Sequence, residues 1–251
     1  ADGLTLIVDD AFAGTMRVTV LALGGSDIEQ TYMGQIAEPG AIGAVNYDDA
    51  GFRPDCIIFI TQNLRTIANL NNLSSSGGAN FGLGVVAATT GDSVTQACLA
   101  VAAANVAAAA NTARTINNVD CIAKLAATGA TVNMRATCTA TRAAGFTLDW
   151  LEITADASAI LYCAIKGPRV VTGDFLTQTS TGAFTEVGLP WPPKAALFAS
   201  VAGASMATNV RADHSATYCG FANLTTQHAQ SVLDLDASDP TLIDTGIDYN
   251  A

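Results

Sequence analysis

The side chains of this chain that could take part in catalysis are few. Only two histidines are present, His214 and His228. Ser215 follows His214, but a catalytic dyad depends on geometry in the fold and not on adjacency, and no GxSxG nucleophile motif occurs. We therefore expect both histidines to be structural, and the sequence predicts no enzyme.

Aspartates near the C-terminal end form a candidate metal site. Asp234, Asp236 and Asp239 are followed by Asp244 and Asp248. Carboxylate oxygens are the ligands that Ca²⁺ prefers, but the spacing lacks the glycine and the terminal glutamate of an EF-hand loop. We expect a solvated acidic loop. A metal site at Asp234, Asp236 and Asp239 is the weaker alternative, and no cofactor is expected.

The cysteines show no metal-binding spacing. None of the six forms a CxxC pair, so the sequence predicts no zinc site. We expect buried free thiols that pack as small apolar side chains, with disulfides, including disulfides between subunits, as the alternative. The six are Cys56, Cys98, Cys121, Cys138, Cys163 and Cys219.

Glycines and aromatic residues also have structural interpretations. Gly24-Gly25 and Gly77-Gly78 belong to no GxxxxGK[ST] motif, so we expect turns that need a positive φ. Four aromatic residues lie in expected strands and are predicted to be core residues rather than a sugar-stacking platform. They are Phe146, Trp150, Phe198 and Phe221.

The clearest organisational feature is an internal repeat. Residues 3–25 align with residues 145–167 without a gap, and Gly25 then corresponds to Gly167. Further along the chain, Phe59 corresponds to Phe198 and Gly84 to Gly220. The recurring residues are those of turns and strands, whereas cysteines and histidines do not recur. The repeat therefore indicates a duplicated scaffold.

Composition limits the possible partners. The chain has 251 residues, a formal net charge of −11 and a pI near 4.3. Its basic residues are scattered singly, which excludes a phosphate-binding face for nucleic acid. The most apolar window, 97–110, is short and alanine-rich, so no membrane span is expected.

Short apolar runs bounded by Gly, Asp, Asn and Pro predict an all-β protein. The pattern is typical of antiparallel β-sandwich or jelly-roll-like units. The alanine-rich segment 97–118 is expected to be a long loop that follows a strand beginning near Thr95. The expected strands are 17–23, 56–61, 82–88, 159–165, 194–200 and 216–222.

The repeat predicts two tandem modules. The first β module is expected at 1–144, and the second at 145–251. The second module lacks a counterpart for 121–144 and is therefore expected to be incomplete at its C-terminal end.

The repeated pieces resemble a β-rich module of bacteriophage and prophage structural proteins. They are GFTLDW from Gly145, the glycine-ended strands LALGG from Leu21 and YCAIKG from Tyr162, and GFRPDCIIFI from Gly51 with its counterpart PWPPKAALFAS from Pro190. The resemblance covers nearly the whole chain twice. It implies a complete module from about residue 27 to 167, and no catalytic residues.

This resemblance implies a virion structural protein, either a capsid decoration protein or a tail or fibre component. Such a protein would act by assembly, with copies of itself and other virion proteins as partners, at the surface of the extracellular particle. An incomplete module edge could receive a strand from a neighbour. A lectin-like receptor-binding module at a fibre tip, with a host surface glycan as partner, is the alternative.

Overall fold

The structure is a computed structural model that describes residues 22–62, 78–89, 92–104, 112–126, 131–154, 158–175, 185, 189–201, 210–212, 214–235 and 247–248. All regular elements of this part are β-strands, which confirms the all-β expectation. The strands are β1 (Gln30–Ala37), β2 (Gly43–Tyr47), β3 (Cys56–Gln62), β4 (Gly78–Ala88), β5 (Val94–Ala104), β6 (Thr112–Asn117), β7 (Ile122–Leu125), β8 (Val132–Arg142), β9 (Gly145–Glu152), β10 (Ala159–Lys166), β11 (Ala195–Val201), β12 (Val210–Ala212), β13 (His214–Asn223), β14 (Gln227–Leu235) and β15 (Ile247–Asp248).

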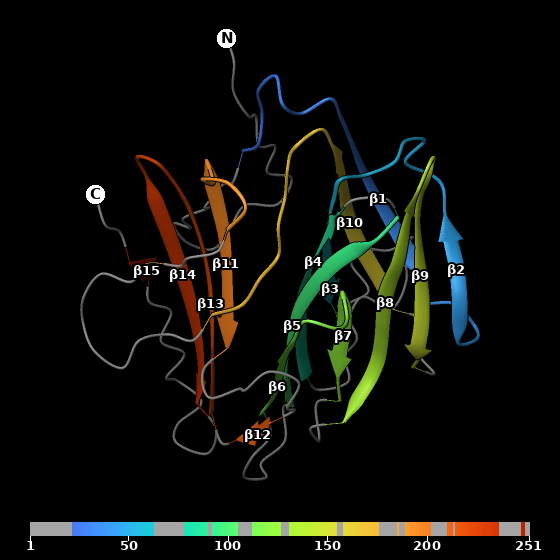
Figure 1. Cartoon of the computed structure of the whole chain (residues 1–251). Helices are drawn as coiled ribbons and strands as arrows, with labels where there is room; N and C mark the ends of the chain where they lie inside the picture. Colours follow the sequence, from blue (N-terminus) through green and yellow to red (C-terminus); the bar gives the residue numbers. More distant parts are fainter. Residues whose placement is uncertain are drawn as a thin grey trace, which may run out of the picture.

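Two antiparallel sheets form a sandwich (Figure 1). One has seven strands in the order β1-β10-β3-β4-β5-β6-β12, and the other has four in the order β2-β9-β8-β7. A further four-stranded sheet, β11-β13-β14-β15, lies beside them. Five of the six predicted strands are confirmed as β3, β4, β10, β11 and β13, while residues 17–21 lie outside the described part and 22–24 form no strand.

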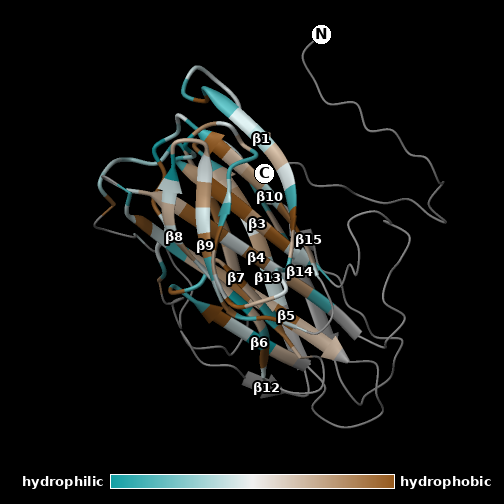
Figure 2. Ribbon diagram, turned by 90° about the vertical axis from the view of Figure 1, so that its right-hand side faces the viewer, coloured by the Kyte–Doolittle hydropathy of each residue, from teal (hydrophilic) through white to brown (hydrophobic). Residues whose placement is uncertain are grey.

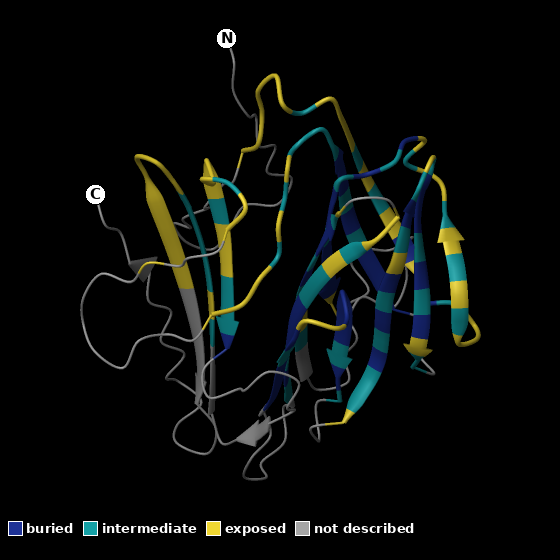
Figure 3. Cartoon of the chain, in the orientation of Figure 1, coloured by how far each residue is buried: buried dark blue, intermediate teal, exposed yellow. Residues whose placement is uncertain are grey.

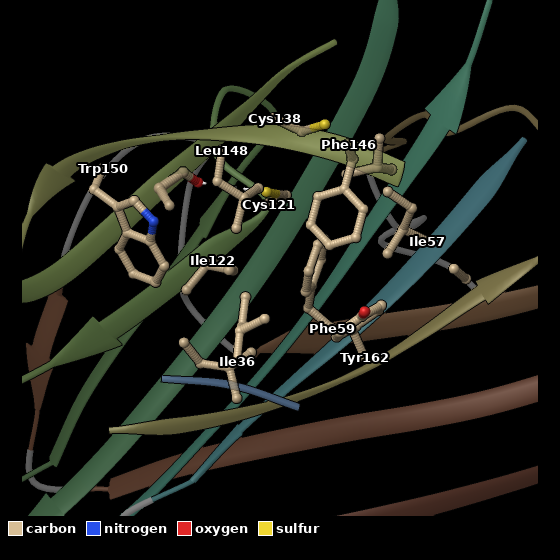
Figure 4. Packing of buried hydrophobic residues seen from close by; sticks show 14 of the residues in the cluster. Ile36, Ile57, Phe59, Cys121, Ile122, Cys138, Phe146, Leu148, Trp150 and Tyr162 are labelled. Atoms are coloured by element: carbon tan, nitrogen blue, oxygen red, sulfur yellow. Dashed lines mark hydrogen bonds between the residues drawn. The ribbon is translucent and has the colours of Figure 1, made fainter. Parts of the chain in front are cut away.

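Aromatic side chains from both sheets fill the centre of the sandwich (Figure 4). The Phe146 ring of β9 lies 5.7 Å from Phe59 of β3 and 5.2 Å from Tyr162 of β10, both edge-on. Trp150 donates its indole N–H to the hydroxyl of Tyr47 at 3.0 Å, so its one polar group is satisfied. This core explains why Phe146 and Trp150 are buried, as expected. The same prediction is wrong for Phe198, which is exposed on β11, and Phe221 is half-buried.

Glycine in β4 allows the sheets to approach closely. A Cβ atom on Gly84 would lie 1.7 Å from the carbonyl oxygen of Cys121, directly before β7. A Cβ on Gly82 would lie 2.9 Å from the carbonyl oxygen of Ala123. The backbone of β7 therefore packs directly on β4, which only glycine permits.

The alanine-rich segment corrects the sequence prediction of a long loop at 97–118. β5 continues to Ala104, and β6 occupies Thr112–Asn117; the residues between them lie outside the described part. Ala100, Ala102 and Ala113 are buried in a small core with Leu125 of β7. Small side chains suit strands that another strand crosses at short distance, so packing overrides the helical propensity of alanine.

The strand pairing does not fit a division at residue 144. β8 and β9 form a tight hairpin in which Arg142 pairs with Gly145, so this boundary falls inside one sheet. The strands from β1 to β10 instead build the sandwich together, and β12 from the later part of the chain adds the last strand of the seven-stranded sheet. The duplication of modules itself stays a prediction.

Candidate functional site

The six thiols form no disulfide within the chain, and the expectation of buried thiols holds for four of them. Four are buried, while Cys163 and Cys219 are half-buried. Burial raises the pKa of Cys56 and of Cys138 to about 12, and it raises the pKa of the other four thiols as well. The thiols are therefore protonated at neutral pH, which does not suit a cysteine nucleophile.

Both histidines lie on strands of the third sheet. His228 is exposed on β14, and its ring lies 5.5 Å from that of Phe221 on the adjacent strand. The backbone of His214 pairs with Leu235, while its side chain lies outside the described residues.

The aspartate run is only partly described. The backbone of Asp234 lies in β14 opposite Ser215, while Asp236, Asp239 and Asp244 lie outside the described residues. Asp248 pairs with Ala229 as part of β15. Among the residues whose side chains are described, no group of three or more His, Cys, Asp or Glu could hold a metal ion. The metal site at Asp234, Asp236 and Asp239 stays untested.

A serine, a lysine and a glutamate that sequence reasoning missed meet at the end of β1. Lys124 donates to Ser158 Oγ at 2.8 Å, a pairing that can activate serine in some hydrolases. Ser158 is 3% exposed, however, so a substrate could not reach its hydroxyl. The Glu38 carboxylate accepts hydrogen bonds from Thr154 N, from Thr154 Oγ1 at 2.7 Å and from Ser158 N at 3.3 Å. The cluster ties the β9–β10 connection to β1 and is structural.

Asp120, also missed by sequence reasoning, is a buried carboxylate between β6 and β7. Asn117 donates to its Oδ2 at 3.2 Å, and Arg135 lies 3.9 Å from the same oxygen. Burial raises the pKa of Asp120 to about 6, because the nearby Arg135 and Asn117 only partly offset the loss of hydration. Its Oδ1 has no hydrogen-bond partner. The group is poised for protonation but is enclosed, at 2% exposure.

Much of the described part of the third sheet is exposed (Figure 3), and several large apolar residues on and around it are exposed. Phe198 of β11 and Tyr218 of β13 are 45% and 46% exposed, and Leu224 in the following turn is 81% exposed. The ring of Phe175 packs edge-on against Phe198 at 6.2 Å. We call the side of the third sheet that carries Phe198 and Tyr218 the β11–β13 face. It is the described surface best suited to contact a partner.

Sheet edges are a second candidate for contact. In the described part of the chain, β1 pairs with β10 alone, β2 with β9 alone and β11 with β13 alone. Met33 on β1 is 71% exposed, and Ile42 before β2 is 66% exposed. Figure 2 shows alternating hydrophilic and hydrophobic residues along the sandwich strands. Open edges of this kind can add further strands.

No described segment forms a helix that could cross a membrane. Comparison with known proteins found no matching family model, curated protein or solved structure.

Proposed function

We propose that the chain is a structural protein of a bacteriophage-like particle, serving as capsid decoration or as a tail or fibre component. It acts by assembling with copies of itself and with other virion proteins at the particle surface. The observation that carries this proposal is an all-β scaffold whose open edges and β11–β13 face offer contact surface.

The chemistry of the described residues agrees with a role in assembly. The thiols are protonated, Ser158 is enclosed, and the Asp120 carboxylate is buried. Phe198, Tyr218 and Leu224 instead place apolar surface in water, where burial against a partner releases about 25 cal/mol per Å². These features favour binding over catalysis.

Electron microscopy of purified particles from the source virus tests this proposal. Gold-labelled antibodies against the chain should decorate the capsid, the tail or the fibres in a regular pattern. Sedimentation of the purified chain should show oligomers that dissociate in the Tyr218→Ser variant, while the Val119→Ser variant, exposed in the β6–β7 turn, assembles as before. Unlabelled particles together with a monomer at high concentration would overturn the proposal.

A receptor-binding role at a fibre tip is the second candidate. It is favoured by Trp191, which lies before β11 with its ring 4.5 Å from the guanidinium of Arg169. Loop tryptophans can stack on sugar rings. Glycan-array binding that is lost in Trp191→Ala would support this role, and an array without signal would argue against it.

A further inference from the structure

The third sheet repeats part of the sandwich in strand order and in register. One row of directly paired residues crosses four strands of the seven-stranded sheet. It consists of Phe59 on β3, Gly84 on β4, Cys98 on β5 and Asn117 on β6. Across the third sheet, the same row is Phe198, Gly220, Ala229 and Asp248 on β11, β13, β14 and β15. The sequence repeat pairs the two rows residue by residue, so the third sheet is built like β3-β4-β5-β6.

The two sheets differ on the outer side of their first strand. β3 pairs with β10, whereas β11 pairs only with β13 among the described residues. Phe59 is fully buried beneath Phe146 and Tyr162, whereas Phe198 is 45% exposed. Within the described residues, the third sheet therefore lacks a strand beside β11 and a cover over Phe198, which β10 and β9 respectively provide in the sandwich.

Residues 3–25 are a second sequence of the β9–β10 type, in which two consecutive strands lie in opposite sheets of the sandwich. The inward-facing Phe146, Leu148 and Trp150 of β9 correspond to Leu4, Leu6 and Val8. The inward-facing residues of β10 are matched by apolar residues as well. Ile160, Tyr162 and Ala164 correspond to Val18, Val20 and Ala22.

The structure describes the last four residues of this segment, 22–25. They resemble the end of β10 and lie near β11. Gly25 has a φ of +119° and its counterpart Gly167 has +109°, both in the region that favours glycine. In the sandwich, Gly167 N donates to Asp55 before β3 at 2.7 Å. Two residues after Gly25, Asp27 forms an ion pair of 3.0 Å with Lys194, which corresponds to Asp55 and directly precedes β11.

We propose that residues 3–25 dock on the third sheet of the same chain, with residues 18–21 added as an antiparallel strand beside β11. The register follows from the pairing of β10 with β3, in which Tyr162 lies opposite Phe59 and Cys163 opposite Ile58. Val20 then lies opposite Phe198 and Leu21 opposite Leu197. Residues 3–8 cover Phe198 as β9 covers Phe59, and one module is assembled from the two ends of the chain.

Docking within one chain is favoured over docking between copies because of tethering. The contact of Asp27 with Lys194 holds the segment near the first residue of β11, so its effective concentration is on the order of millimolar. This inference concerns the folding of the chain and does not depend on the proposed role in a virion. The docking covers Phe198 and the edge of β11, and it leaves Tyr218, Leu224 and the edges of β1 and β2 as contact surface for that role. Its failure and that of the virion proposal are therefore separate results.

Disulfide trapping in the full chain tests the register. Leu21→Cys with Leu197→Cys, in a background where Cys163 and Cys219 are replaced by alanine, should oxidise rapidly to a linked monomer, because directly opposed strand residues meet the geometry of a disulfide. The matched control, Leu21→Cys with Ala195→Cys, is two residues out of register and should oxidise at least about tenfold more slowly. Equal rates would overturn the proposal.

Mixing the two single variants, Leu21→Cys and Leu197→Cys, separates docking within a chain from docking between copies. A disulfide-linked dimer that forms as fast as the linked monomer of the double variant would overturn docking within the chain in favour of strand exchange. Little dimer supports the proposal.

Hydrogen exchange provides a readout that does not require a disulfide. Val20→Asp places a charge opposite Phe198, so the β11 amides should exchange about tenfold faster or more. Thr19→Asp changes the neighbouring residue, which corresponds to the half-exposed Leu161, and should leave exchange in β11 nearly unchanged. Identical exchange of β11 in both variants and in the parent chain would overturn the proposal, while unchanged exchange in β3 shows that the sandwich stays folded.

Discussion

At the scale of single residues, two buried carboxylates have roles that depend on their surroundings. Glu38 is 7% exposed and accepts three hydrogen bonds from Thr154 and Ser158. Asp120 is similarly enclosed, but one of its oxygens has no hydrogen-bond partner. Because both oxygens of the buried Glu38 accept hydrogen bonds, Glu38 is a structural anchor. Because one oxygen of the buried Asp120 accepts none, the protonation of Asp120 is sensitive to pH.

Replacing Glu38 with glutamine should destabilise the fold. The amide nitrogen of glutamine cannot accept a hydrogen bond, so at least one donor of Thr154 or Ser158 loses its partner. We expect a loss of about 1–3 kcal/mol in the free energy of unfolding, measured with urea. Glu29→Gln, which removes only an exposed ion pair with Lys166, is the control and should change stability by less than about 1 kcal/mol. Equal effects would contradict the anchoring role of Glu38.

Asp120 should make stability depend on pH. The pKa of Asp120 is about 6 in the folded chain against an ordinary value of 3.8, so the folded state binds the proton more tightly. This contribution to stability is present below about pH 4 and is lost as the pH rises to about 6.

Chemical unfolding at several pH values measures this dependence. The Asp120→Asn variant, which stays neutral, should lose this part of the dependence and be at least as stable as the parent chain at pH 8. The same slope between pH 4 and 6 in both chains would contradict the assignment.

At the scale of elements, the crossing of β7 over β4 depends on Gly84. A methyl group there would overlap the carbonyl oxygen of Cys121, which is backbone and cannot turn aside. We expect Gly84→Ala to lower the free energy of unfolding by about 3 kcal/mol or more. Gly40→Ala, where no atom lies within 4 Å of the added Cβ, should have little effect. Thermal unfolding of both variants checks this, and similar midpoints would contradict the packing argument.

A polar side chain also joins two elements. Gln96 of β5 donates to Thr137 Oγ1 at 2.5 Å and accepts from Cys138 N at 2.8 Å, where the register of β8 shifts. The bulge leaves backbone groups of β8 without a ladder partner, and the amide of Gln96 satisfies one of them. Gln96 therefore fixes the position of β8 over the seven-stranded sheet.

At the scale of the whole molecule, stability should be distributed unevenly. β3 and β10 lie inside the seven-stranded sheet and are largely buried, whereas residues 227–230 of β14 are exposed. Hydrogen exchange followed by mass spectrometry should show protection in β3 and β10 that exceeds that of 227–230 by orders of magnitude. Equal protection would mean that the third sheet unfolds together with the sandwich.

Five of the fifteen described strands were located from the sequence because their signals are local. Apolar runs between turn residues located β3, β4, β10, β11 and β13. The positive φ expected at Gly25 is confirmed, whereas Gly78, also expected in a turn, begins β4. The sequence located the start of β5 near Thr95 but not its continuation to Ala104, and it missed β6. Their alanines favour a helix locally and become strand residues only because β7 packs closely against them.

The sequence alone determined the all-β class, several turns, the low content of charged residues and the negative net charge. These properties depend only on neighbouring residues and on composition. Only the tertiary structure decided which polar residues are enclosed and which apolar residues are exposed. Glu38 meets Thr154 across 116 positions of the chain, and Asp120 is buried by strands on either side of it. Phe59 and Phe198 occupy equivalent places in the repeat, yet one is buried and the other exposed, because burial depends on which strands pack above a residue.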